Sequence, residues 1–151
     1  MSNRRNYKRS QGKIKAAAAL RENKRKRRKQ EFKQAQSEFE NFSNESFFFT
    51  GIALYWAEGN KRADRFLFMN SDAEMIRFMI TWCMRYFSLE KNAIYVRLHL
   101  HGSYAHENCE RFWHTKTGIP WSNFMKIVYT PESKKYKKRP EYKGCARLEA
   151  V

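Results

Sequence analysis

Residues 51–59 read Gly-Ile-Ala-Leu-Tyr-Trp-Ala-Glu-Gly and follow three phenylalanines, Phe47 to Phe49. A segment this apolar on all sides predicts a helix that is buried on most sides, either against its own sheet alone or against its sheet and a partner subunit. We expect the helix to end at Glu58, with Gly59 in a left-handed conformation. The helix dipole disfavours an anion at the C-terminal end of a helix. We therefore expect a cation beside Glu58, and Mg²⁺, a hard metal ion that prefers oxygen ligands, is a suitable one.

The segments on the C-terminal side of this helix alternate between helix and strand patterns. Ser71 to Glu74 form a capping box that starts a helix running to Phe87. The other patterns predict strands at 65–70, 93–101, 124–130 and 145–151 and a helix at 105–116, which Gly118 stops. We therefore predict an α+β fold with a mixed or antiparallel sheet packed by helices. The final strand pattern runs to the end of the chain, so we expect an incomplete C-terminal element.

The strand at 93–101 has one apolar and one polar face, and the polar face carries Arg97, His99 and His101. This face would lie on a nucleic acid. An alternative is a Zn²⁺ site made of His99, His101, His106 and Cys109. Because their spacing matches no common zinc module, we expect a polar sheet face without Zn²⁺.

Charge divides the chain into an N-terminal extension, residues 1–40, and a body, residues 41–151. The extension holds 14 basic and 4 acidic residues, whereas residues 41–130 hold 10 and 8 and residues 131–151 hold 7 and 3. Residues 12–40 are rich in helix formers, and residues 1–10 are expected to be a disordered basic tip. The extension is therefore either a basic helix that binds phosphates or a plain charged linker.

A net charge of +16 indicates a polyanionic partner, and nucleic acid is the expected one. An anionic membrane is less suitable, because no basic segment carries a bulky apolar face. The expected contacts lie in two basic runs, in the loop after Glu58 and on the strand faces. They are Lys24, Arg25, Lys26, Arg27, Arg28, Lys29, Lys61, Arg62, Arg97, His99, His101, Lys126, Lys134, Lys135, Lys137, Lys138 and Arg139.

The cysteine content and the apolar runs bear on the compartment. Cys83, Cys109 and Cys145 are an odd number with no CxxC pair, which favours a reducing setting. The most apolar run, 47–56, is about half of the roughly 20 residues that cross a bilayer, and no signal peptide pattern opens the chain. We therefore expect a cytoplasmic protein, nucleoid-associated if bacterial.

The helix at 47–58 resembles the motif of the LAGLIDADG homing endonucleases. Leu54, Ala57 and Gly59 match that motif, Glu58 takes the place of its acid, and Ala53 replaces the glycine that lets two helices pack closely. Trp56 stands where the family has a small or polar residue. The chain also resembles a bacterial group in which a YW-x-E-G helix precedes an N-S-D helix start, here residues 55–59 and 70–72.

The resemblance covers residues 45–151 and implies a saddle of strands that lies along duplex DNA. It implies that motif helices of two subunits pack together, so that one motif per chain means a homodimer on a roughly two-fold site. Glu58 would then be the catalytic metal ligand for Mg²⁺-dependent hydrolysis of DNA phosphodiesters. The alternatives are a non-catalytic regulator or RNA-binding protein on the same fold, and a Glu58 that pairs with Lys61 or Arg62.

Overall fold

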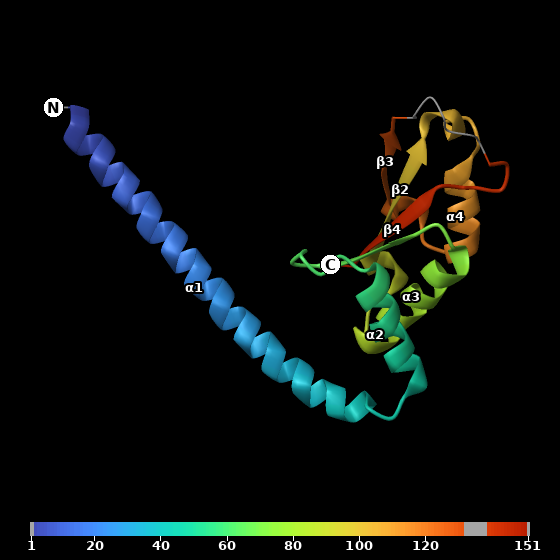
Figure 1. The fold of residues 1–151 in the computed structure, drawn as a ribbon, viewed down its shortest axis with the longest axis horizontal. Helices are drawn as coiled ribbons and strands as arrows, with labels where there is room; N and C mark the ends of the chain where they lie inside the picture. The colour runs from blue at the N-terminus through green and yellow to red at the C-terminus, as the bar shows by residue number, and fades with distance from the viewer. Residues whose placement is uncertain (1, 132–138, 151) are drawn as a thin grey trace. The chain divides into compact units, whose positions relative to one another are not determined.

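The structure, a computed structural model, describes the backbone of residues 2–131 and 139–150 and the side chains of 11–131 and 139–150. The chain divides into two compact units, residues 1–44 and 45–151. The first contains a single helix, α1 (Ser2–Phe42) (Figure 1). The expectation of a disordered tip over residues 1–10 is therefore wrong, since the helix begins at Ser2.

The second unit is an α+β fold, as the alternating patterns predict (Figure 1). Its sheet has the strand order β1-β4-β2-β3, formed by β1 (Phe66–Asn70), β4 (Cys145–Ala150), β2 (Ile94–His101) and β3 (Phe124–Thr130). β4 pairs antiparallel with both β1 and β2, whereas β2 and β3 are parallel. The sheet is thus mixed, and the C-terminal strand lies inside it rather than at its edge.

α2 (Ser46–Glu58) contains the motif-like segment and is much less buried than its composition suggests. Only Phe48 and Gly51 are buried, while Phe49 and Ile52 are each 43% exposed and Trp56 is 77% exposed. The chain's own sheet and helices therefore bury only one side of α2, and the expected burial against a partner subunit stays a prediction. The helix has one packed face and one exposed apolar face.

Gly59, which follows α2, is extended rather than left-handed, with φ −77° and ψ 151°. The residue forms an isolated antiparallel bridge with Phe68 of β1. A Cβ added at Gly59 would lie 2.4 Å from the ring of Tyr55. Glycine is therefore required here for close approach to that ring, and not for a positive φ.

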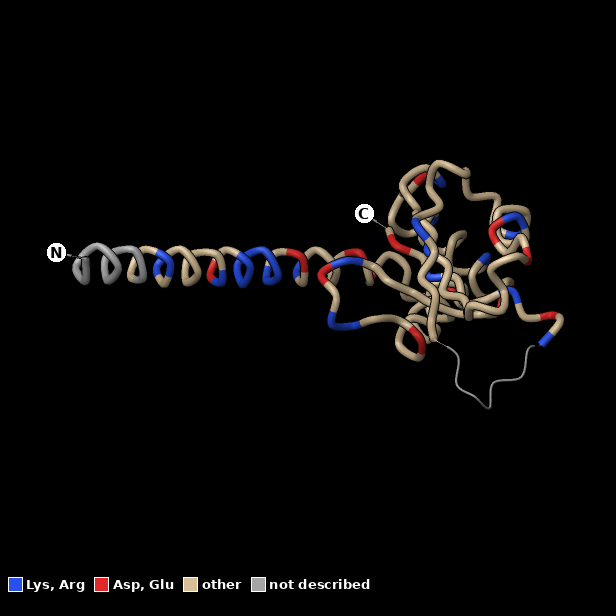
Figure 2. The backbone as a smooth tube through the Cα atoms, turned by 90° about the horizontal axis from the view of Figure 1, so that it is seen from above, with Lys and Arg blue, Asp and Glu red and all other residues tan. Residues whose placement is uncertain are grey.

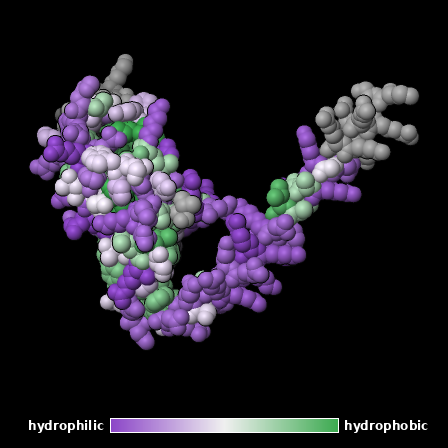
Figure 3. All heavy atoms as spheres, turned by 180° about the vertical axis from the view of Figure 1, so that it is seen from behind, coloured by the Kyte–Doolittle hydropathy of each residue, from purple (hydrophilic) through white to green (hydrophobic). Residues whose placement is uncertain are grey.

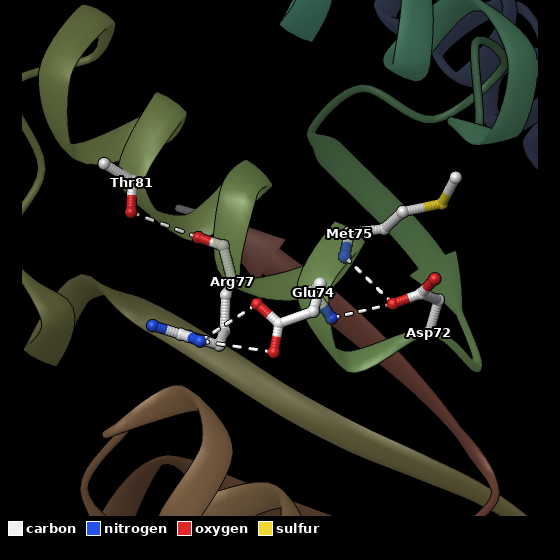
Figure 4. Close-up of polar contacts among 5 residues, drawn as sticks. All are labelled: Asp72, Glu74, Met75, Arg77 and Thr81. Carbon is white, nitrogen blue, oxygen red and sulfur yellow. Dashed lines mark hydrogen bonds and ion pairs between the residues drawn. The ribbon is translucent and has the colours of Figure 1, made fainter.

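α3 (Ala73–Tyr86) begins at Asp72, whose side-chain oxygen accepts hydrogen bonds from the backbone N–H groups of Glu74 and Met75 (Figure 4). The predicted cap was Ser71, one residue too early. Glu74 forms an ion pair with Arg77 one turn later instead of reaching back to the cap. Placing Asp72 at this position satisfies two amide donors and puts its negative charge at the positive end of the helix dipole.

α4 (Cys109–Thr117) begins four residues later than predicted and ends at Gly118, which is left-handed at φ 65°. α3 packs against both α2 and α4 and contacts β1 and β4, so that the three helices form one layer. The buried core lies between this layer and the sheet. Its fully covered large side chains include Trp113, Tyr104, Phe68, Ile76, Met79, Ile94, Leu98, Ile119 and Leu148. No described helix is both long and apolar enough to cross a bilayer.

Candidate nucleic-acid interface

One face of the sheet carries the polar side chains that the strand pattern predicted. Along β2, Ile94, Val96, Leu98 and Leu100 are buried, and the intervening residues keep part of their surface exposed. The register places this second set beside the alternate residues of β1 and β4. We call this surface the open face; its residues are Met69, Tyr95, Arg97, His99, His101, Cys145, Arg147 and Glu149.

Arg97 and Arg147 lie directly opposite one another at the centre of the open face. Like charges in this arrangement repel. The carboxylate of Glu149, only 3% exposed, lies between them: Arg147 Nη2 donates to Glu149 Oε1, and Arg97 Nε lies 3.6 Å from the same oxygen. Arg65 Nη2 reaches the other carboxylate oxygen at 3.2 Å. These three arginines and Glu149, here called the arginine cluster, carry a net charge of +2.

His99 lies beside the arginine cluster on β2. Partial burial and the positive charges of Arg147 and Arg97 lower the pKa of His99 below its ordinary value, which Glu149 opposes only weakly. The Nε2 atom of His99 is buried and has no hydrogen-bond partner among the described residues. The neutral form of the imidazole is therefore favoured by burial and by the two neighbouring arginines.

A pocket of about 370 Å³ brings together two predicted site residues that are 41 positions apart. Its wall includes Glu58 and Asn60 at the end of α2, together with His99 and Arg147 of the open face. The bridge between Gly59 and β1 brings the end of α2 to this edge of the sheet. Glu58, which is exposed, thus lines the same pocket as Arg147 and His99.

The two basic residues that follow Glu58 do not neutralise it. The ammonium group of Lys61 donates to the backbone oxygen of Trp56 at 2.6 Å and thereby caps α2, while the Arg62 amide donates to the side chain of Asn60. Within the described part of the chain, Glu58 forms no ion pair. The alternative in which Glu58 merely pairs with Lys61 or Arg62 is therefore wrong.

α1 presents the first basic run, Lys24 to Lys29, on an exposed helix (Figure 2). Six consecutive residues at 3.6 per turn point to all sides, so positive charge surrounds the helix. Arg25 pairs with Glu22 at 3.0 Å and Arg27 with Glu31 at 3.1 Å. Figure 3 shows this helix as hydrophilic apart from one short apolar stretch.

The remaining predicted contacts are scattered. Lys126 is exposed on β3. It lies near the point, between Arg97 and His99 of β2, where the pairing of β2 with β3 shifts register. Arg139 has an exposed side chain, and its backbone N–H and C=O both bond to the hydroxyl of Tyr104. Lys134, Lys135, Lys137 and Lys138 lie outside the described residues.

The histidines and Cys109 do not form the zinc set considered above. Cys109 is 3% exposed in the core, whereas His106 is exposed. Among the described side chains, no three His, Cys, Asp or Glu residues are grouped so that they could hold a metal ion. His99 and His101 instead lie on the open face with the arginine cluster.

Three residues of the arginine cluster, Arg65, Arg147 and Glu149, were absent from the predicted site. The alternation of Cys145, Arg147 and Glu149 with Ala146, Leu148 and Ala150 is visible in the sequence and predicts a two-faced strand. The pairing of this strand with β2 is not visible there. Without that pairing, nothing places Arg147 opposite Arg97.

The comparisons with known proteins yield no relative for this chain. No protein-family model, no curated protein and no solved structure matches it. The residues and their geometry therefore carry the functional argument.

Proposed function

We propose that this chain is a DNA-binding protein that contacts duplex DNA through the open face of its sheet. The observation that carries the proposal is the pair Arg97 and Arg147 at the centre of that face, in a chain of net charge +16. Guanidinium groups are well suited to phosphate and to base edges. His101 and Lys126 would extend the contact along the strands.

The basic runs would add contacts to the DNA backbone. α1 carries positive charge on all sides over Lys24 to Lys29, and a phosphate backbone gains affinity from each counterion released. Such contacts are independent of base sequence. We assign affinity chiefly to α1, and orientation on the duplex to the open face. The proposed location is cytoplasmic, nucleoid-associated if the source is bacterial.

The resemblance to LAGLIDADG homing endonucleases implies that the protein would also cleave DNA. In this reading a homodimer would bring together two Glu58 side chains as metal ligands. Mg²⁺ binds through one or two carboxylates together with substrate phosphates and water. One exposed Glu58 per chain, in a pocket with the amide of Asn60, fits such a shared site. Bound Mg²⁺ would stabilise the charge that develops during phosphodiester hydrolysis. Glu58 would bind the metal, and Arg147 and His99 would face the substrate.

The exposed apolar face of α2 is the proposed dimer interface. Phe49, Ile52, Ala53, Trp56 and Ala57 recur at helical spacing and are exposed. A second copy of this helix would cover them and bring the two Glu58 side chains to the same region. In a chain with a single motif, this exposed face would provide the dimer interface that brings the two Glu58 side chains together.

Trp56 favours a second candidate, a non-catalytic binder on the same fold. Its indole is 77% exposed on the face where two α2 helices would meet. Such bulk would keep the helices apart and separate the two acids. The binder would retain the open face and α1 and act as a regulator or bind RNA.

The test separates binding from cleavage with Glu58→Gln in the whole chain. A Mg²⁺-dependent nuclease requires the wild type to cleave duplex DNA and the variant to retain its affinity while losing cleavage. A non-catalytic binder requires equal affinity of both proteins and no cleavage by either. Equal affinity for duplex DNA and for single-stranded RNA of the same length would contradict the assignment to duplex DNA.

A further inference from the structure

The arginine cluster contains more hydrogen-bond donors than its acceptor can satisfy. A guanidinium carries five N–H donors, and one carboxylate offers about four lone-pair sites. Three arginines share Glu149, and among the described residues Arg97 has one further acceptor, the sulfur of Met125 at 3.5 Å. Glu149 therefore leaves arginine N–H donors available for a second anionic acceptor.

Buried nitrogen atoms without a hydrogen-bond partner lie at the same place. Within the described chain, Arg97 Nε, Arg147 Nε and His99 Nε2 are buried without hydrogen-bond partners. Buried polar atoms without partners are rare in folded proteins and call for an explanation at each position. Here three of them come from neighbouring residues of two adjacent strands, next to the hollow lined by Arg147 and His99.

Glu149 is placed to hold the side chains of Arg97 and Arg147 rather than to contact a ligand itself. Its side chain is 3% exposed, whereas the side chains of Arg97 and Arg147 are each 26% exposed. Its carboxylate offsets the repulsion between Arg97 and Arg147 and ties both side chains to one oxygen. Two long side chains are thereby held in a defined arrangement before any ligand arrives.

We propose that Glu149 is a positioning residue that sets the guanidinium groups of Arg97 and Arg147 to receive one phosphate group between them. The inference rests on the proposed function, since the phosphate we assign is a backbone phosphodiester of duplex DNA. The same chemistry would also accept free inorganic phosphate. Arg65 pairs with the second carboxylate oxygen of Glu149, and its side chain is 55% exposed.

The direction in which Glu149→Gln changes the affinity for duplex DNA distinguishes a positioning role of Glu149 from the effect of its negative charge alone. The substitution removes a negative charge, so if Glu149 were only a nearby anion, duplex DNA would bind more tightly to the variant. Positioning predicts the opposite: binding weakened about tenfold, because each charge-assisted contact is lost when the guanidinium groups separate. Fluorescence anisotropy with a labelled duplex measures this in the whole chain, and urea unfolding checks that the variant is folded.

Arginine variants show whether a single phosphate is shared, and do not depend on Glu149→Gln being folded. Arg97→Lys and Arg147→Lys keep the charge and lose the planar fork, and each should weaken binding. In the double variant Arg97→Gln/Arg147→Gln, the slope of log K against log salt should fall by about one and not two. Arg77→Gln/Arg85→Gln, an equal charge change at two ion-paired residues of α3, is the matched control and should leave the slope unchanged.

Nuclear magnetic resonance of the Nε–Hε groups distinguishes the two phosphate sources. Duplex DNA should shift the Arg97 and Arg147 signals in the wild type and not in Glu149→Gln. Shifts with inorganic phosphate but none with duplex would support the phosphate site and contradict the proposed DNA binding. Tighter or unchanged DNA binding by Glu149→Gln, lysine variants equal to the wild type, or shifts with neither ligand would overturn the inference.

Discussion

Gly51 of α2 lies against the indole of Trp82 of α3, so closely that a Cβ at residue 51 would lie 2.1 Å from Trp82 Nε1. The same Nε1 donates a hydrogen bond to the backbone oxygen of Phe48 at 3.1 Å. A glycine and a buried tryptophan thus set the distance between the two helices. This contact fixes which face of α2 is packed and which face, with Trp56, is exposed.

Gly51→Ala should destabilise the body. The added methyl group must displace Trp82, which is 3% exposed, and overpacking of this kind costs about 1–3 kcal/mol. This cost outweighs the gain of roughly 1 kcal/mol in helix propensity. Urea unfolding followed by tryptophan fluorescence measures the change. Gly102→Ala is the control, since a Cβ there meets nothing within 4 Å, and equal stability of the two variants would contradict the packing described.

Ile52→Glu should abolish the proposed homodimer. The residue lies in the middle of the exposed apolar face of α2, and a dimer would bury the new charge without a partner. Sedimentation equilibrium should give a dimer for the wild type and a monomer for the variant. Met84→Glu, a change at a 36% exposed apolar residue of α3, should remain dimeric. A monomeric wild type at every concentration would contradict the dimer and favour the non-catalytic binder.

The lowered pKa of His99 predicts a pH dependence of stability. Because the folded protein binds this proton less well than the unfolded chain, stability is complete above the unfolded pKa of about 6.5. The stability contributed by His99 then decreases as the pH falls from the unfolded pKa of His99 through its lower pKa in the folded protein. His99→Gln should remove this component, whereas His106→Gln, at an exposed histidine, should keep it. Urea unfolding measured between neutral and mildly acidic pH gives the comparison, and identical profiles for wild type and His99→Gln would contradict it.

The three cysteines should differ in reactivity and provide a footprint of the open face. Burial raises the pKa of Cys83 to about 12, and Cys109 is 3% exposed, so both should resist alkylation in the folded protein. Cys145 lies on the open face opposite His99 and is only half-buried, so it should react first. Duplex DNA should slow alkylation of Cys145, as measured by mass spectrometry. An unchanged rate under saturating DNA would argue against contact at this face.

Local patterns predicted the elements of the body well, because each depends on nearby residues. The alternation over Ile94 to His101 marks β2, and Gly118 ends α4 through a left-handed conformation that glycine tolerates. The caps were less predictable. Ser71 and Asp72 are both good capping residues, and only the structure shows that Asp72 bonds to the amides of Glu74 and Met75.

The candidate site was predicted only in part, because it depends on strand pairing. Glu58, Arg97 and His99 were identified from their local context, but a polar strand face does not reveal which strand lies beside it. Arg147 and Glu149 join the site only because β4 inserts between β1 and β2. The exposure of Trp56 was also not predictable, since an apolar helix suggests burial and does not show whether its own chain provides it.

The central claim, that the body itself binds duplex DNA, is tested most directly by removing α1. The measurement compares the duplex affinity of the whole chain with that of residues 45–151 at two salt concentrations, by fluorescence anisotropy. The body carries 17 basic and 11 acidic residues, so the salt-dependent part of the affinity should fall strongly. We predict that residues 45–151 still bind and that Arg97→Gln weakens this binding. Complete loss of binding with α1, while residues 45–151 remain folded, would contradict the claim and leave α1 alone as the DNA-binding element.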